Sequence, residues 1–156
     1  MANASTSWTA GADFDSRACV DTNIVVYAHD PSDRLKHAKA VALIEQLSNE
    51  GRLVLGAQVF NEFSSVMMRR NRTLTLRPDE VATILREMEA IAEVVPITPS
   101  ITFRALDAMP RHGLSFWDAL IWAAAKENGV EVVYTEDFQH GRDVEGVRIV
   151  NPFAAT

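Results

Sequence analysis

The amino-acid sequence predicts an α/β domain with a central, mainly parallel sheet. Short runs of apolar and β-branched residues alternate with longer stretches of helical periodicity. The run from Val130 to Thr135 is rich in β-branched and aromatic residues, as expected of a strand buried on both faces. The chain has 156 residues, of which 47% are hydrophobic and 23% charged, so it can form a single globular domain with a core.

The chain up to residue 93 is expected to hold two strands and four helices. Pro31 and Ser32 mark the start of the second helix, and Gly51 follows its end. Pro78 and the acids after it mark the start of the fourth helix. The predicted strands are 17–20 and 52–55. The predicted helices are a short one within 21–30, followed by 31–49, 58–70 and 77–93.

The second half begins with a short strand whose proline, Pro96, suggests a sheet edge. A helix follows from Thr98 to about Met109, where Pro110 and Gly113 are expected to break it. A strongly apolar helix then starts at Ser115, and Asn128 with Gly129 forms a typical end signal. The predicted strands here are 94–97, 130–135 and 147–150, with a polar loop over 136–146.

Composition limits the organisation and location of the protein. Residues 1–16 lack periodicity and are expected to be a mobile extension, whereas residues 17–156 are expected to form one domain. No apolar run is long enough to cross a bilayer, and no secretory signal is visible. The single cysteine, Cys19, excludes an internal disulfide and a multi-cysteine metal site. These features predict a cytoplasmic protein that does not associate with membranes.

Four carboxylates are expected at one rim of the sheet, because ligands collect outside the carboxyl ends of parallel strands. Asp21 and Asp137 follow strands, Glu62 lies in the helix after the second strand, and Asp118 lies near the start of the apolar helix. Each acid also has a purely structural interpretation. Asp21 can cap a helix, Asp118 can form a capping box with Ser115, Glu62 can be solvated, and Asp137 can be a turn residue.

Taken together, the four acids indicate a metal site. Unpaired carboxylates that converge repel one another, and the local sequence offers no lysine or arginine to neutralise them. A hard divalent cation with oxygen ligands would do so, and Mg²⁺ or Mn²⁺ fits such a site. The net charge of −6 argues against simple electrostatic binding of nucleic acid but is compatible with an enzyme that holds cations.

Several motifs, in order and spacing, resemble those of PIN-domain ribonucleases, with the closest likeness to VapC-like toxins of toxin–antitoxin modules. The matching stretches are Val20–Ile24, Asn61–Phe63, Leu114–Ile121, Tyr134–Gly141 and Val147–Phe153. The resemblance implies a three-layer α/β/α fold with about five strands and Mg²⁺- or Mn²⁺-dependent cleavage of RNA. The family's metal-binding acids carry over to Asp21, Glu62, Asp118 and Asp137.

Two polar residues of the family pattern also have counterparts in this chain. Asn23 matches the polar residue after the first acid, and we expect it to orient Asp21 or a water. Ser115 matches the Thr or Ser before the third acid. It can cap the helix, contact the scissile phosphate, or do both.

The resemblance further implies an antitoxin that covers the site, often with a basic side chain among the acids, and a homodimer. For the RNA substrate, the densest basic run contains Arg69, Arg70 and Arg72, and Arg142 lies in the loop after Asp137. The basic run can equally be a solvated helix end.

Two other functions compete with the ribonuclease. A haloacid-dehalogenase-like phosphatase would use Asp21 as a nucleophile, but it needs a second acid two residues later, where this chain has Asn23. A non-catalytic module that binds RNA or protein would retain the fold without cleaving RNA.

Overall fold

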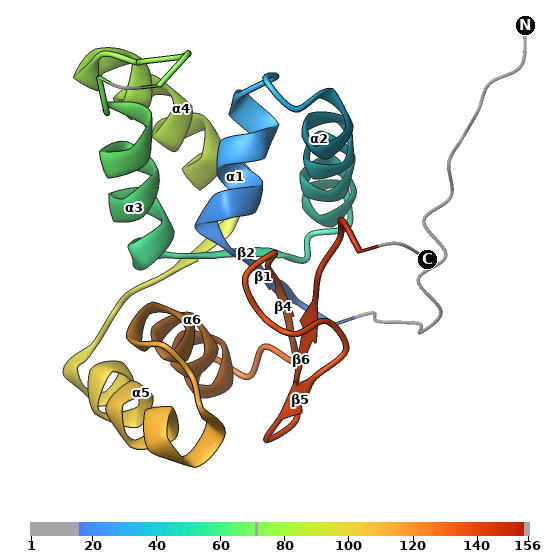
Figure 1. Ribbon diagram of the computed structural model, residues 1–156, viewed down its shortest axis with the longest axis vertical. Coiled ribbons are helices and arrows are strands. Elements are labelled where there is room, and N and C mark those ends of the chain that lie inside the picture. Colours follow the sequence, from blue (N-terminus) through green and yellow to red (C-terminus); the bar gives the residue numbers. More distant parts are fainter. Residues whose placement is uncertain (1–15, 71, 155–156) are drawn as a thin grey trace, which may run out of the picture.

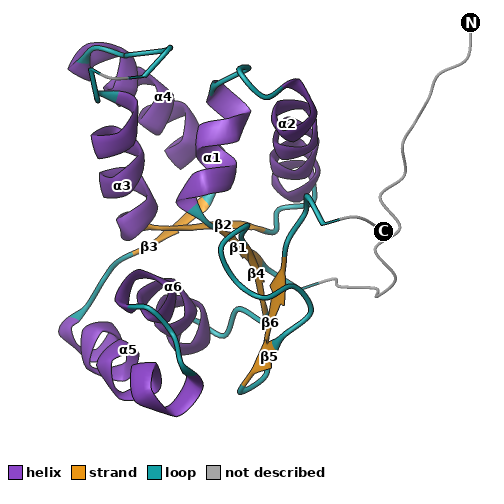
Figure 2. Cartoon of the chain, viewed as in Figure 1, coloured by secondary structure: helices purple, strands orange, loops and turns teal. Residues whose placement is uncertain are grey.

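The protein is an α/β/α sandwich, as the ribbon of the computed structural model shows (Figure 1). The model describes residues 16–70 and 72–154. The helices of residues 22–91 lie on one face of the sheet, and those of residues 99–127 cover the other (Figures 1 and 2). The predicted fold class is therefore confirmed. The predicted extension, residues 1–16, lies outside the described residues except for Ser16.

The sheet has six strands in the order β3-β2-β1-β4-β6-β5. All neighbours pair in parallel except β5 and β6, which are antiparallel. The strands are β1 (Ala18–Val20), β2 (Leu53–Gly56), β3 (Glu93–Val95), β4 (Val132–Tyr134), β5 (Asp143–Val144) and β6 (Val147–Val150). The strand with Pro96 just beyond its end, β3, is at an edge, as predicted. One strand, β5, lies within the stretch that was expected to be a loop. A strand of two residues is too short to show the alternation of apolar and polar side chains that would identify it in the sequence.

Four helices pack on one face around an apolar core. They are α1 (Thr22–His29), α2 (Arg34–Asn49), α3 (Ala57–Met67) and α4 (Pro78–Ile91). Side chains of β1 alternate between the faces: Ala18 and Val20 join this core, whereas Cys19 joins the opposite one. Burial raises the pKa of the Cys19 thiol to about 12, so it remains a neutral core residue.

The other face is covered by α5 (Pro99–His112) and α6 (Phe116–Glu127). Trp122, a residue of α6, is fully buried, and its Nε1 donates to the carbonyl oxygen of Val144 over 2.9 Å. The predicted end near Met109 is three residues early, because α5 continues through Pro110 to His112 and ends at Gly113, whose φ is 65°. A proline this close to the end removes one backbone donor, and only two helical residues remain beyond it.

The topology brings the ends of three adjacent strands to one rim. β1 lies between β2 and β4, and all three run in the same direction. Asp21 follows β1, α3 begins directly after β2, and Thr135 follows β4. Within residues 16–70 and 72–154, no helix has the length and apolar character needed to span a bilayer.

Candidate active site

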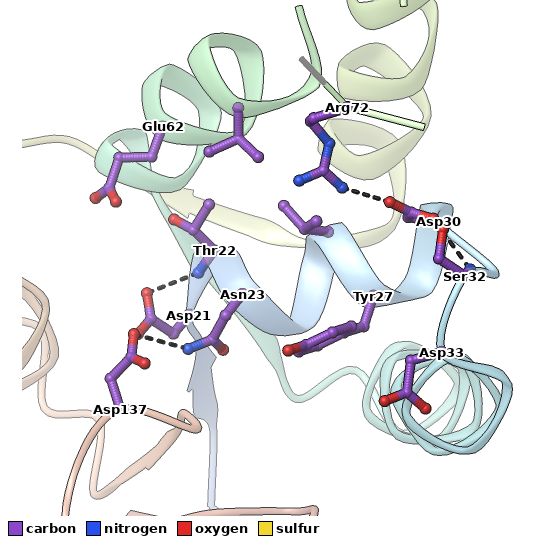
Figure 3. Close-up of a pocket in the computed structure, with 12 residues that line it drawn as sticks. Asp21, Thr22, Asn23, Tyr27, Asp30, Ser32, Asp33, Glu62, Arg72 and Asp137 are labelled. Atoms are coloured by element: carbon purple, nitrogen blue, oxygen red, sulfur yellow. Dashed lines mark hydrogen bonds and ion pairs between the residues drawn. The ribbon is translucent and has the colours of Figure 1, made fainter. Parts of the chain in front are cut away.

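A pocket of about 340 Å³ runs along α1 from the rim of the sheet (Figure 3). Acidic and amide side chains gather at the rim end, whereas Asp30, Ser32 and Arg72 mark the other end (Figure 3). The pocket is lined by Asp21, Thr22, Asn23, Val26, Tyr27, Asp30, Ser32, Asp33, Glu62, Val66, Arg72 and Asp137. Three of the four predicted acids therefore share one cavity.

Asp21 is the most buried acid of the pocket, with 7% of its surface exposed. Its Oδ1 accepts from the backbone N–H of Thr22 over 2.7 Å, and its Oδ2 accepts from Thr135 Oγ1 over 2.7 Å. Burial raises the pKa of Asp21 to about 6, and the charges of Glu62 and Asp137 add to the shift. Asp21 is thus the N-cap of α1 and also a carboxylate whose ionised form is disfavoured by its surroundings in the pocket.

Asn23 is hydrogen-bonded to Asp137, the acid that follows β4. Its Nδ2 donates to Asp137 Oδ2 over 3.0 Å and lies 3.5 Å from Thr135 Oγ1 (Figure 3). The backbone N–H of Asp137 also donates to Thr135 Oγ1, over 3.2 Å. Thr135 therefore links the acid that follows β1 to the acid that follows β4.

Glu62 extends from α3 toward the same end of the pocket (Figure 3). Its Oε1 accepts from Gln58 Nε2 over 2.5 Å, and the same nitrogen lies 3.2 Å from the carbonyl oxygen of Trp117. Gln58 therefore connects the second acid to the first turn of α6. Glu62 is held by a buried amide and is more than a solvated helix acid.

Asp118 is not among the residues that line the pocket. It is half-buried in the first turn of α6, where its backbone N–H lies 3.3 Å from Ser115 Oγ. Ser115 is the N-cap of α6, so the capping interpretation agrees with the geometry. Among the described contacts, Asp118 is connected to the other acids only through its neighbour Trp117, whose carbonyl oxygen accepts from Gln58, which in turn donates to Glu62.

The oxygen donors of the pocket suit a hard divalent cation. Neighbouring cations are already paired, Arg72 with Asp30 and Lys36 with Glu136. In the described part of the chain, no three Asp, Glu, His or Cys side chains are close enough together to hold an ion. A divalent ion at this rim would therefore bind only one or two carboxylates directly and take its remaining ligands from water, as Mg²⁺ and Mn²⁺ commonly do.

The predicted RNA-binding arginines are in different surroundings. Arg69 and Arg70 are exposed beyond α3. Arg72 reaches into the pocket, where hydrogen bonds from Ser32 and Arg72 hold the pKa of Asp30 below its ordinary value. Arg142 donates to the carbonyl oxygen of His112, so this guanidinium supports the loop after Asp137.

Sequence reasoning did not single out Thr135 or Gln58. Thr135 has no exposed surface, although it is polar and ends an apolar strand. A buried hydroxyl needs a partner, so its position at the end of β4 was a usable signal. Gln58 gave no such signal, because a glutamine in the first turn of a helix is usually exposed.

A second cluster holds the loop that carries Asp137. Lys36 Nζ pairs with Glu136, donates to Tyr27 Oη over 3.1 Å and lies 4.8 Å from the centre of the Tyr27 ring. It also lies 5.5 Å from the centre of the Phe153 ring. Hydrogen bonds to Glu136 and Tyr27 raise the pKa of Lys36 above its ordinary value. The loop and the C-terminal segment are thereby fixed to α1 and α2.

Comparison with known proteins agrees with this architecture. The family model of the PIN domain matches residues 18–142. No match was found among curated protein sequences.

Several solved structures share the fold. Mycobacterium tuberculosis VapC20, described as a sarcin–ricin loop cleaving toxin, aligns with a TM-score of 0.59 and 20% identity over 77% of this chain and 91% of its own. A toxin–antitoxin complex from Klebsiella pneumoniae aligns with a TM-score of 0.62 and 18% identity, over 88% and 99%. DNA-bound VapBC from Salmonella typhimurium aligns with a TM-score of 0.60 and 16% identity, over 86% and 96%.

Proposed function

Because the chain belongs to the PIN domain family, we propose that it is a metal-dependent endoribonuclease and the toxin of a type II toxin–antitoxin pair. The observation that carries the proposal is Asp21, a buried carboxylate at the end of the central strand that pairs with no basic side chain of residues 16–70 and 72–154. Structures of similar fold include VapC20, described as a sarcin–ricin loop cleaving toxin, which supports the same conclusion.

The ion would be Mg²⁺ or Mn²⁺, held by Asp21 together with Glu62, Asp137 and Asp118, directly or through water. Such an ion lowers the pKa of a bound water and screens the charge of the phosphate. Asp21 would contribute most, because its burial leaves its negative charge least solvated. Thr135 and Asn23 would keep Asp21 and Asp137 in place through the contacts described above.

RNA would approach over the exposed end of α3, where Arg69 and Arg70 have no side-chain partner among the described residues to give up on meeting phosphates. Arg72 would contact RNA only after leaving Asp30, and Arg142 only after leaving the His112 carbonyl. Ser115 would act mainly as the cap of α6, which positions Asp118.

An antitoxin is the proposed protein partner. Several structures of similar fold are toxin–antitoxin complexes. The pocket combines five carboxylates with the apolar side chains of Val26 and Val66, so it can accept a basic side chain on an amphipathic segment. A homodimer and a cytoplasmic location complete the proposal.

RNA cleavage by matched variants tests the proposed activity. Wild type with Mn²⁺ should cleave structured RNA to 5′-phosphate and 3′-hydroxyl products, whereas Asp21→Asn and Asp118→Asn should lose cleavage by several hundredfold or more, about 3–4 kcal/mol. Glu87→Gln is the control, because Glu87 is an exposed acid on α4. Full activity of both aspartate variants would overturn the proposal.

Two outcomes would favour the competing functions. Wild type that binds Mn²⁺ but leaves every RNA intact would be a non-catalytic module. A phosphoryl group trapped on Asp21 would instead indicate the phosphatase.

A further inference from the structure

Gln58 is a buried amide between two helices on opposite faces of the sheet. Only 5% of its surface is exposed, and it lies one turn before Glu62 on α3. Its Nε2 donates to Glu62 Oε1 over 2.5 Å and to the carbonyl oxygen of Trp117 over 3.2 Å. Because α3 and α6 cover opposite faces, this contact joins the two helical layers beyond the ends of the strands (Figure 1).

The orientation of the amide is determined by its partners. Both of those partners are oxygen acceptors, so exchanging the oxygen and nitrogen of the side chain would set oxygen against oxygen at both contacts. In this orientation, Oε1 is buried without a hydrogen-bond partner among the described residues. An apolar side chain of similar size would avoid that unpaired acceptor. The glutamine is therefore better explained by its two donated hydrogen bonds than by packing.

The two bonds connect residues that belong to the proposed site. Glu62 lines the pocket with Asp21, and Trp117 directly precedes Asp118. The Trp117 carbonyl lies in the first turn of α6, so fixing it also fixes the turn that carries Asp118. Gln58 thus provides the described link between Asp118 and the acids of the pocket.

We propose that Gln58 is a positioning residue, which sets Glu62 and the first turn of α6 at the separation that a shared divalent ion requires. The inference rests on the proposed function only in that these acids hold an ion. Groups that orient metal ligands typically change metal affinity when they are removed, even though they do not touch the metal.

The test compares Mn²⁺ affinity, measured by calorimetry, in wild type and Gln58→Met, which keeps the length of the side chain and removes the amide. Affinity should fall by about 10-fold. Gln46→Met is the control. Gln46 Nε2 also donates to a glutamate four residues later, Glu50, over 3.1 Å, but on the exposed surface of α2. This control should bind Mn²⁺ as wild type does.

A double-mutant cycle separates positioning from a general structural effect. In a Glu62→Gln background, Gln58→Met should reduce Mn²⁺ affinity much less than it does in wild type. Gln58→Asn, which keeps an amide too short to reach both partners, provides a second variant if Gln58→Met does not fold. It should also weaken Mn²⁺ binding.

Wild-type affinity in the folded Gln58 variants would overturn the inference, as would equal losses in both backgrounds or a wild type that binds no Mn²⁺. A wild type that binds Mn²⁺ with the expected dependence on Gln58 but cleaves no RNA would overturn only the proposed ribonuclease.

Discussion

Thr135 Oγ1 donates a 2.7 Å hydrogen bond to Asp21 Oδ2, and both side chains are buried at the ends of adjacent strands. The register of β1 and β4, in which Val20 pairs with Tyr134, places these two residues side by side. This bond lowers the pKa of Asp21 and partly offsets the effect of burial. The charge of the central acid therefore depends on a residue 114 positions away in the chain.

Replacing Thr135 with valine should destabilise the protein by about 1–3 kcal/mol, because it leaves buried polar groups without their partner. The pKa of Asp21 should also rise, so Mn²⁺ binding should begin at a higher pH. Urea unfolding and Mn²⁺ titrations at several pH values measure the two effects. Thr135→Ser keeps the hydroxyl and should remain close to wild type. Valine and serine variants with the same stability would contradict this role.

Metal-free protein should become more stable through Asp21 as the pH falls from about 7 to 4. The folded-state pKa of about 6 exceeds the ordinary value of 3.8, so the folded protein takes up this proton first. The effect is at most about 3 kcal/mol. Asp21→Asn removes the buried charge and should melt at a higher temperature than wild type at pH 7.5 in chelator.

Because other groups also titrate, the difference between wild type and Asp21→Asn is the quantity to follow. This gap in melting temperature should shrink toward pH 4. A gap that stays constant from pH 7.5 to 4 would show that Asp21 is not the group responsible.

Mn²⁺ should raise the melting temperature of wild type, because an ion that binds only the folded state stabilises it. At a concentration 100 times Kd the gain is about 2.7 kcal/mol, or roughly 5–10 °C for a domain of this size. Glu62→Gln and Asp118→Asn should show smaller shifts, and Glu87→Gln the full shift. A full shift in Asp118→Asn would contradict a shared site and remove Asp118 from it.

Lys36→Met should loosen the loop that carries Asp137. The ammonium group pairs with Glu136 and lies over the Tyr27 ring, and both charged side chains are partly exposed, so the expected loss of stability is only about 1 kcal/mol. Hydrogen exchange of residues 135–141 should become faster. Lys39→Met, on the same helix, is the control, because Lys39 forms no ion pair among the described residues. Unchanged exchange in Lys36→Met would rule out this restraint.

Much of the fold follows from local patterns in the sequence. Alternating strands and helices, together with the acid after the first strand, predicted the parallel sheet and the rim where Asp21, Glu62 and Asp137 meet. These features depend on the periodicity of apolar residues and on the rule that the carboxyl ends of parallel strands lie at one edge of the sheet.

The unpredicted features depend on contacts between distant residues. Gln58 contacts the Trp117 carbonyl from the opposite face of the sheet, and Asn23 reaches Asp137 from α1. Neither bond has a signature in the local sequence, because each is set by how the layers pack. The separation of Asp118 from the pocket likewise depends on where α6 lies relative to α1 and α3.

The strand order has a consequence for synthesis of the protein. β1 is made first, but its neighbour β4 ends only at Tyr134, and Asp137 comes later still. A nascent chain that stops before residue 132 has no strand on that side of β1 and lacks both Thr135 and Asp137. The ribosome must therefore complete nearly the whole domain before the pocket can form. A chain proposed to cleave RNA therefore cannot assemble its pocket until its own translation is nearly complete.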